Sequence, residues 1–401
     1  MNHKTTYRRC PICSDLQAEI LHTMNFAITM GLSLPQNYDV VSCLQCGFVY
    51  ADTPASQTTY NEYYTYYSKY EDPAIASGGG HTPADAKRID ETISLLEQYI
   101  PSKESKIVDI GCGNGGFLQN LKQRGYKNLH GIDPSVDCIN YVNKCMPDGK
   151  SYVLKLSEIQ AVSSTLGRYD FVILSHVLEH LVDLIPALSS IRTILAEQGN
   201  VYIEVPDASR YTSHAGVPFY YFDCEHINHF DRCALGNLAT ITAFEMFASG
   251  EKELQLSQSM RYPAVFGLFR LASPQHSQVL QQCDSLTQHI KQYIECSKEQ
   301  NEFPLLQTLA SSQQPIILWG AGSYTQRLLM SSPLPQCNII AIVDSDSRKH
   351  GLILHDIKIE SPLVIYEKYT EIPIVISTAF HSENIRQQIF SLALTNEIMS
   401  L

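Results

Sequence analysis

The stretch KIVDIGCGNGGFL, residues 106–118, decides the fold, because an apolar strand runs directly into a glycine turn and then into a helix. Glycines permit a turn that is too tight for a side chain, and they let a ligand approach the backbone at the carboxyl end of the strand. The next apolar segment ends in Asp133, about twenty residues beyond Gly113, where a carboxylate can accept hydrogen bonds from ribose hydroxyls. The turn and the acid together predict a pocket for a nucleotide-like cofactor.

The segments around this turn alternate between short apolar strands and amphipathic helices. Further strands are predicted at residues 128–133, at 199–207 and at the start of YDFVILSHVLEHL, residues 169–181, which reads as a strand followed by a helix. This alternation indicates an α/β fold with a mainly parallel, Rossmann-like sheet and helices on both faces. Residues 241–256 and 263–273 predict two adjacent strands that close the sheet as an antiparallel pair.

The composition describes a globular chain without a disordered bias. The 401 residues are 44% hydrophobic and 17% charged, and no apolar run approaches the length of a membrane span. The polar start, MNHKTTYRRCPICSD, predicts no signal peptide, so we expect a cytoplasmic protein without a membrane partner. The formal net charge of -12 argues against nucleic acid as a partner, because nucleic acid selects basic surfaces.

Changes along the chain predict three domains. Residues 1–75 hold two cysteine pairs and the tyrosine-dense run YNEYYTYYSKY, and residues 76–273 hold the alternating pattern described above. Residues 274–401 hold a glutamine-rich helical segment and a second αβ alternation. The stretch ASGGGHT, residues 76–82, predicts a flexible joint between the first two domains.

The glycine turn suits two cofactors, because Gly111, Gly113 and Gly116 also satisfy the GxGxxG pattern of dinucleotide sites. The segments VDIGCGNGGFL, GIDPS and YDFVILSHVLEHL resemble the class I S-adenosylmethionine-dependent methyltransferases. This resemblance favours S-adenosylmethionine over NAD. It implies that Asp109 lies beside the methionine part and that Asp133 holds the ribose. The other cofactor-binding residues that it implies are Gly111, Gly113 and Gly115 in the turn, Leu156 and Ser157 near adenine, and Ser175.

Four of the twelve cysteines form two CxxC pairs, Cys10 with Cys13 and Cys43 with Cys46. Two such knuckles suit a tetrahedral Zn²⁺, and four thiolate ligands leave no open position for catalysis, so the predicted zinc is structural. Reduced or paired thiols and a thioredoxin-like redox centre are the alternatives. In a reducing compartment we expect metal or free thiols rather than disulfides, and we expect the other eight cysteines to be buried apolar residues.

A second glycine turn follows the predicted strand PIILW in the last domain. It contains Gly320 and Gly322, and the next strand ends near Asp344 and Asp346. This pattern predicts a second dinucleotide-type unit, whose helix start could hold a phosphate. The alternatives are an NAD site and a purely structural αβ domain that closes over the active site.

The order of a cysteine module, a methyltransferase domain and a terminal αβ domain resembles the three-domain sugar C-methyltransferases across nearly the whole chain. That resemblance implies methylation of a nucleotide-linked 4-keto sugar at the carbon beside the carbonyl, in an active site between the middle and terminal domains. Methylation of a sugar oxygen or amine is the nearest alternative. A non-catalytic binding protein on the same fold is the alternative from a different class.

The stretch YYFDCEHINHFDR, residues 220–232, follows a late strand and concentrates acids, imidazoles and a thiol. The resemblance implies that His226 is the base, that Glu225 is its partner, and that His180 orients the substrate or stabilises an oxyanion. His180 could instead be a histidine packed at a helix start. The whole stretch has two other interpretations: a metal site formed by Asp223, Cys224, His226, His229 and Cys233, or a helix cap by Asp223 above packed histidines.

Three positions depart from the sugar methyltransferase pattern. Asp223 stands where that family has a tyrosine, SQSMR at residues 257–261 lacks a glycine pair before Arg261, and GAGSYTQ at residues 320–326 lacks a following lysine. The family also places a tyrosine from the first domain in its active site. In this chain that tyrosine could equally be Tyr66, Tyr67 or Tyr70. The alternative is that the tyrosine-dense run forms a packing face on a helix.

Overall fold

A computed structural model describes residues 3–31, 33–67, 82–214, 216–255, 261–273, 279–379 and 382–401. Three sheets organise the described chain, one for each predicted domain. The joint predicted at residues 76–82 lies outside the described residues except for Thr82, which caps the first helix of the middle domain. No helix in the described ranges combines the length and the apolar character needed to cross a bilayer.

The N-terminal module is a five-stranded antiparallel sheet with one borrowed strand. Its elements are β1 (His3–Thr5), β2 (Gln17–Asn25), β3 (Asn37–Cys43), β4 (Val49–Asp52) and helix α1 (Gln57–Tyr67). The fifth strand, β10 (Asn228–His229), comes from the middle domain and pairs with β4, so that Asn228 lies opposite Tyr50. The module is therefore joined by backbone hydrogen bonds to the segment that contains Glu225 and His226.

The middle domain is built on a seven-stranded sheet in the order β11-β12-β9-β8-β5-β6-β7. Its strands are β5 (Lys106–Ile110), β6 (Asn128–Asp133), β7 (Lys150–Val153), β8 (Tyr169–Ser175), β9 (Leu195–Pro206), β11 (Phe244–Gln255) and β12 (Arg261–Leu271). The five strands from β5 to β9 run parallel, and β12 pairs antiparallel with both β9 and β11. The predicted parallel core and antiparallel closing pair are both confirmed.

Helices cover the two faces of this sheet, as the alternating sequence predicts. They are α2 (Pro83–Leu96), α3 (Gly116–Gln123), α4 (Val136–Cys145), α5 (Ser163–Leu166), α6 (Leu184–Ile194) and α7 (Arg232–Ile241), with 3₁₀ turns η1 (Glu97–Tyr99), η2 (Leu156–Val162), η3 (Leu178–His180) and η4 (Ala208–His214). The helix predicted directly after β8 is wrong: only η3 forms there, and α6 begins at Leu184. The central strand β8 reads FVIL because it is covered on both faces, and Val172, Ile173 and Leu174 have no exposed surface.

The C-terminal domain is a second αβ unit with the strand order β15-β16-β14-β13-β17-β18. Its strands are β13 (Ile316–Trp319), β14 (Ile339–Val343), β15 (Ile353–Leu354), β16 (Ile357–Glu360), β17 (Ile374–Ile376) and β18 (Ile398–Ser400). Its helices are α9 (Pro304–Ser312), α10 (Ser323–Ser331), α11 (Val364–Lys368) and α12 (Ser382–Ser391), with 3₁₀ turns η5 (Leu334–Gln336) and η6 (Ser347–Lys349). All pairs except β15–β16 are parallel, so this sheet also has one edge at which its strands end together.

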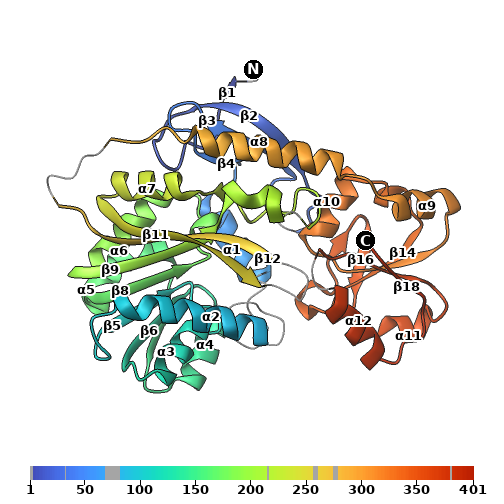
Figure 1. Cartoon of the computed structure of the whole chain (residues 1–401). Coiled ribbons are helices and arrows are strands. Elements are labelled where there is room, and N and C mark those ends of the chain that lie inside the picture. The colour runs from blue at the N-terminus through green and yellow to red at the C-terminus, as the bar shows by residue number, and fades with distance from the viewer. Residues whose placement is uncertain are drawn as a thin grey trace.

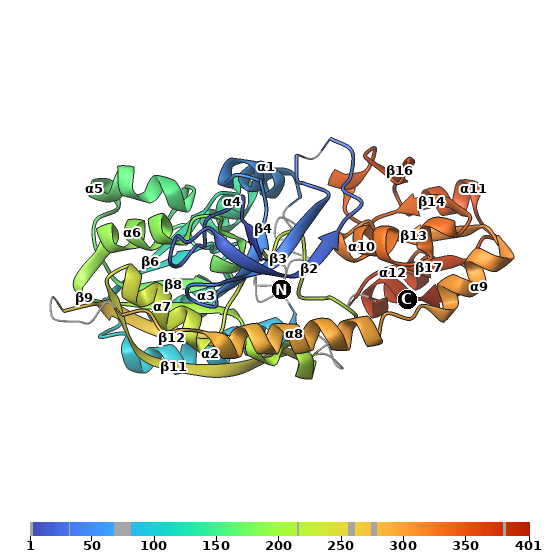
Figure 2. The same ribbon diagram turned by 90° about the horizontal axis from the view of Figure 1, so that it is seen from above.

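A long helix, α8 (Asp284–Glu299), connects the middle and C-terminal domains. Figures 1 and 2 show α8 lying beside the N-terminal module, with the C-terminal domain at its far end and α10 on the side of that domain that faces the rest of the chain. The α8 helix contacts the module through Thr287, whose hydroxyl lies 2.7 Å from that of Ser42. The three domains therefore meet around α8, α10 and the loop between η4 and β10.

Candidate active site

The glycine turn after β5 forms an open cradle at the carboxyl edge of the sheet. Gly111, Gly113 and Gly115 have φ values of 75°, 49° and 75°, a left-handed backbone that favours glycine. A side chain at Gly111 would meet Val177 at 2.6 Å and one at Gly115 would meet Val142 at 2.8 Å, whereas a side chain at Gly113 would meet nothing within 4 Å. The outer two glycines thus permit close packing, and Gly113 leaves space in which a ligand could approach the backbone.

Two acids flank this cradle. Asp133 ends β6, where its carboxylate accepts a hydrogen bond from the Gly113 amide at 2.9 Å and another from the Ser135 amide at 2.8 Å. Asp109 is 2% exposed, and burial and the neighbouring Asp133 raise its pKa to about 7, although Arg88 acts in the opposite direction. Asp133 is therefore fixed on the turn, and Asp109 is a buried acid that a nearby positive charge would ionise.

The other predicted cofactor residues lie along the same edge. Leu156 and Ser157 begin η2 directly after β7, and Ser175 is the last residue of β8. Leu156 packs on the core, Ser157 is exposed, and the Ser175 hydroxyl donates to Glu204 at 3.1 Å. The open backbone at Gly113 and the acid Asp133 fit a ribose-containing cofactor such as S-adenosylmethionine, and Leu156 offers an apolar contact for its adenine.

A buried ionic cluster lies next to Ser175, at the ends of β8 and β9. Glu204 has no exposed surface and contacts the ammonium group of Lys252 at 2.5 Å and His176 Nε2 at 3.4 Å. Burial opposes the charged form of His176, but Glu179 and Glu204 outweigh it and raise the His176 pKa to about 9. His176 is therefore an imidazolium at neutral pH, with a left-handed φ of 57° that turns the chain from β8 into η3.

The predicted catalytic histidines are brought together by η3 and the loop before β10. The His180 Nδ1 atom lies 3.1 Å from the Glu225 carbonyl oxygen, and the Ile227 amide donates to the Glu179 carbonyl at 2.8 Å. The rings of His180 and His226 have centroids 4.8 Å apart and are nearly perpendicular, at 79°. His180 is buried and His226 is half-buried. The structure thus joins two predicted site residues that lie far apart in the sequence.

Glu179 is a site residue that the sequence prediction does not single out. Its carboxylate has no exposed surface, and one of its oxygens lies within 4.8 Å of ring nitrogens of His180 and His226. Although burial favours its neutral form, the imidazoles of His176, His180 and His226 hold the pKa of Glu179 below its usual value. Its place in VLEHL, beside His180, is the signal that could reveal it. These three groups could also hold a divalent cation.

Glu225 and Asp223 lie in buried surroundings on the same loop. The Glu225 carboxylate accepts a hydrogen bond from the Tyr63 hydroxyl of α1 at 3.1 Å. Tyr63 belongs to the tyrosine-dense run, but it is not among the three tyrosines named from the sequence. Tyr70 lies outside the described residues, and so do the side chains of Tyr66 and Tyr67.

The metal-site interpretation of residues 220–232 is wrong in its stated form. The five residues proposed as one metal site fall into separate groups, because His226 lies with Glu179 and His180, and Cys233 lies with Asp231 and Cys283. Asp223 does not cap the helix that follows this stretch, α7, because Asp231 accepts from the Ala234 amide there at 2.8 Å. Asp223 instead lies at the start of α10, where it accepts a hydrogen bond from the Ser323 hydroxyl at 2.7 Å.

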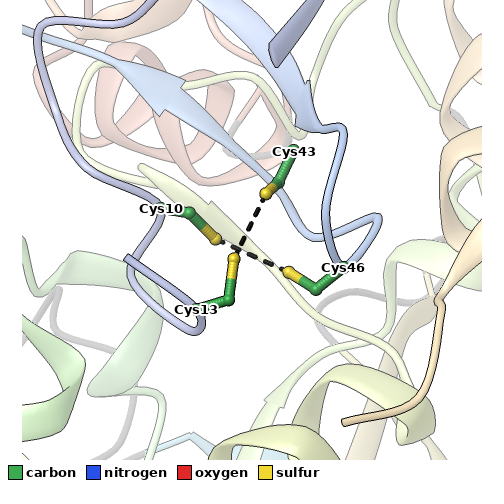
Figure 3. A group of neighbouring side chains, drawn as sticks. All are labelled: Cys10, Cys13, Cys43 and Cys46. Carbon is green, nitrogen blue, oxygen red and sulfur yellow. Dashed lines mark hydrogen bonds between the residues drawn. The ribbon is translucent and has the colours of Figure 1, made fainter. Parts of the chain in front are cut away.

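The four predicted zinc ligands converge in the N-terminal module (Figure 3). The Sγ atoms of Cys10 and Cys46 lie 3.6 Å apart, and those of Cys13 and Cys43 lie 3.4 Å apart. The two turns are alike: Ser14 N donates to the Cys10 carbonyl and Gly47 N to the Cys43 carbonyl, each at 2.9 Å. Four thiolates around a tetrahedral zinc, each at about 2.3 Å from it, lie roughly 3.8 Å from one another. The cluster therefore fits Zn²⁺.

The expectation that disulfides are absent is wrong. Cys233 at the start of α7 and Cys283 at the start of α8 form a disulfide. Four of the other predicted apolar cysteines are buried, but Cys145 is exposed and Cys296 is half-buried. The pairing was not visible in the sequence, because the two cysteines are 50 residues apart and belong to no short motif.

Two family models match parts of the chain. Residues 84–248 match a model described as a methyltransferase domain, and residues 312–399 match a model described as C2185-like, N-terminal. Each match covers less than half of the chain. The first match contains the glycine turn, both acids, η3 and the loop with His226.

Curated relatives and solved structures are each similar to part of the chain. A tRNA U34 carboxymethyltransferase of Campylobacter hominis is 26% identical over 114 residues, which cover 28% of this chain and 39% of that protein. The mitochondrial ubiquinone biosynthesis O-methyltransferase of Homo sapiens is 27% identical over 140 residues, which cover 32% of this chain and 37% of that protein. The chain thus spans less than half the length of either relative. A magnesium protoporphyrin IX methyltransferase from Synechocystis, solved with bound SAM, has a TM-score of 0.38 at 13% identity and covers 53% of this chain and 96% of that structure.

The strand order, the glycine turn and the family match agree on one assignment. Residues 84–248 form a class I S-adenosylmethionine-dependent methyltransferase domain.

Proposed function

We propose that the whole protein is an S-adenosylmethionine-dependent methyltransferase that methylates a nucleotide-linked sugar, at a carbon beside a carbonyl, with His226 as the base. The observation that carries this proposal is the half-buried imidazole of His226 beside His180 and the buried carboxylate of Glu179. A carbon acceptor needs a base of this kind, because its proton must leave before or during methyl transfer.

S-adenosylmethionine, when bound, supplies a methyl group that is already strongly electrophilic. The protein therefore has to align the acceptor and remove a proton. In the proposed step His226 takes the proton from the acceptor carbon and becomes an imidazolium. The buried negative charge of Glu179, within 4.8 Å, stabilises that imidazolium.

His180 has a positioning role in this proposal. A carbonyl oxygen can only accept, so the ring nitrogen Nδ1 that faces the Glu225 carbonyl at 3.1 Å carries the proton. In the neutral ring Nε2 is then an acceptor, which cannot donate a hydrogen bond to an enolate. Of the two roles implied by resemblance, orientation is therefore favoured over oxyanion stabilisation.

The sugar rests on the three-domain order, with the cysteine module and the C-terminal αβ domain on either side of the methyltransferase domain. We retain the domain limits 1–75, 76–273 and 274–401, a structural zinc in the module, and the cytoplasmic location expected from the polar start of the sequence. A sugar oxygen or amine is the second candidate acceptor, because His226 could deprotonate a hydroxyl or an amine equally well.

A non-catalytic protein on this fold is the alternative of a different class. Isothermal titration with S-adenosylmethionine separates the two. The enzyme must bind this cofactor, whereas a protein that acts only through contacts with partners need not bind it. The acceptor is then identified by incubating the enzyme with methyl-labelled cofactor and a panel of nucleotide sugars, and by locating the label with NMR. Label on carbon supports the proposal, label on oxygen or nitrogen supports the second candidate, and binding without transfer to any member of the panel contradicts the sugar.

A further inference from the structure

The second glycine turn shares one feature with the cofactor turn: an acid after the next strand accepts two backbone hydrogen bonds. The Ala321 amide donates to Asp344 Oδ2 at 2.8 Å and the Asp346 amide donates to Oδ1 at 2.9 Å. In the methyltransferase domain, Gly113 and Ser135 donate to Asp133 in a comparable way, although Gly113 is the third residue of its turn and Ala321 the second. The turn precedes α10, and the amino end of such a helix, at the carboxyl edge of a parallel sheet, is where nucleotide phosphates bind.

In this chain an internal carboxylate lies at that helix end. Asp223 is 8% exposed, and its Oδ2 accepts a hydrogen bond from the hydroxyl of Ser323, the first residue of α10, at 2.7 Å. The Asp344 carboxylate is engaged as well, because the ammonium group of Lys349 lies 3.0 Å from its Oδ2. A negative charge at the amino end of a nine-residue helix is stabilised by the amides of the first turn, which have no partner within the helix, and by the helix dipole.

We propose that Asp223 is an internal substitute for a ligand phosphate, through which the C-terminal domain holds the catalytic loop in place. Asp223 is then a positioning residue, and the second glycine turn is an intramolecular docking site rather than a cofactor site. Its catalytic consequence rests on the proposed function, because His226 lies three residues from Asp223.

A second contact from α10 supports this docking. One turn beyond Ser323, the buried guanidinium of Arg327 donates to the Phe219 carbonyl and lies 3.5 Å from the Phe222 carbonyl. On the other side of the loop, the Tyr38 hydroxyl of the N-terminal module donates to the Asp223 carbonyl at 2.8 Å. The loop is thus held between α10 and the module immediately before Glu225 and His226.

A double-mutant cycle on the pair tests the contact. We compare Asp223→Ala, Ser323→Ala and the double variant. Ser331→Ala is the matched control, because the Ser331 hydroxyl donates within α10, to the Arg327 carbonyl at 2.8 Å. Hydrogen exchange of the amides at residues 221–227 is the readout that needs no substrate. We expect each single variant to raise the hydrogen-exchange rate of these amides at least tenfold. The double variant should exchange little faster than either single variant, and Ser323→Thr, which keeps the hydroxyl, should retain the protection of the parent protein. The proposal would be overturned if the increases in exchange rate of the two single variants multiplied in the double variant. It would also be overturned if Ser331→Ala raised exchange as much as Ser323→Ala.

Inorganic phosphate tests the substitution itself. In Asp223→Gly the helix end is vacated, so millimolar phosphate should bind and restore at least part of the protection at residues 221–227. The parent protein, with its carboxylate in place, should show no phosphate-dependent change. Equal phosphate effects in both proteins, or none in Asp223→Gly, would contradict the internal substitute.

Steady-state kinetics distinguish a positioning role from a general loss of folded structure. With a substrate that the parent protein methylates, Ser323→Ala should lower kcat about tenfold and leave the dissociation constant of S-adenosylmethionine within twofold of the parent value. A loss of cofactor affinity equal to the loss of kcat would contradict a positioning role. If no acceptor is found, the proposed function fails, whereas the exchange and phosphate measurements still decide the docking.

Discussion

His180 and Glu225 are joined by a hydrogen bond from ring Nδ1 to a backbone carbonyl oxygen at 3.1 Å, and this bond ties η3 to the loop that contains Glu225 and His226. His180→Phe keeps an aromatic ring but leaves the carbonyl without this donor. We expect a loss of about 1 kcal/mol in the free energy of unfolding and a larger relative loss of kcat. Denaturant unfolding and steady-state kinetics measure the two effects. A variant with unchanged kcat would show that the bond has no role in placing the loop.

His226→Ala should retain cofactor binding and lose turnover. Removal of a general base lowers kcat by about 10²- to 10⁴-fold, whereas the cofactor cradle lies on other elements. Titration calorimetry and single-turnover methyl transfer measure the two properties. His214→Ala is the control, because His214 on η4 bonds to the Arg210 carbonyl and to Glu253, away from the proposed site. Equal activities of the two variants would remove His226 as the base.

Asp109 should make both stability and cofactor binding depend on pH. Its pKa is about 7 in the folded chain against 3.8 for the ordinary group, so between these values the folded state holds a proton that the unfolded state has released. The contribution of Asp109 to the free energy of unfolding of the cofactor-free protein should therefore decrease as the pH rises from 4 to 7, by roughly 4 kcal/mol at most. Denaturant titrations of the parent protein and of Asp109→Asn over this range isolate that contribution as the difference between the two proteins.

Asp109→Asn should remove most of this pH dependence, whereas Asp148→Asn, at an acid with a side chain 91% exposed, should not. The positive sulfonium of S-adenosylmethionine favours the ionised Asp109, so binding near pH 6 should release a proton. Calorimetry in buffers of different ionisation enthalpy detects that proton. Binding heats that do not depend on the buffer would contradict the coupling.

The cysteine cluster should hold one zinc per chain. Removal of the metal by a strong chelator, or Cys46→Ser, should lower the melting temperature, because the metal links the two turns of a small module. Elemental analysis and Co²⁺ absorption, with its thiolate charge-transfer bands, report the site. Cys145→Ser, at an exposed cysteine, is the control and should retain the metal. Full stability after complete zinc removal would show that the cluster is not structural.

The Cys233–Cys283 disulfide should stabilise the junction of α7 and α8. A link across 50 residues constrains the unfolded chain by about 4 kcal/mol in the loop-entropy description. Cys233→Ser should therefore lower the melting temperature and remove the sensitivity of that temperature to reductant. Cys296→Ser, at an unpaired cysteine on α8, should do neither. A parent protein that melts at the same temperature with and without reductant would contradict this expectation.

The sequence predicts the αβ core and its nucleotide-type pocket because strand, turn and acid follow one another locally. Asp109, the glycines and Asp133 lie within one βαβ unit, so their spacing indicates the pocket, whereas the choice of S-adenosylmethionine over NAD follows from the resemblance. The cysteine knuckles are predictable for the same reason. The strand β10, which follows the loop with His226, is not predictable from the sequence. Its two residues become a strand only because they pair with β4 of another domain.

Contacts between residues that lie far apart along the chain could not be predicted from the sequence. The segment VLEHL marks Glu179 and His180 as candidates, but it does not tell how each is oriented toward His226, since η3 is a short 3₁₀ turn without a helical period. The bond between Asp223 and Ser323 joins positions 100 residues apart, and each residue taken singly suggests only a local cap.

The pairing of β10 with β4 has a consequence for the order of folding. During synthesis the N-terminal module emerges first, but the outer edge of β4 lacks its partner until Asn228 and His229 have been made. An uncovered strand edge can pair with other chains, and a contact between distant parts of a chain forms slowly. The nascent protein is therefore exposed to misassembly at β4 until ribosomes have completed most of the methyltransferase domain, and chaperone dependence should be greatest in that interval.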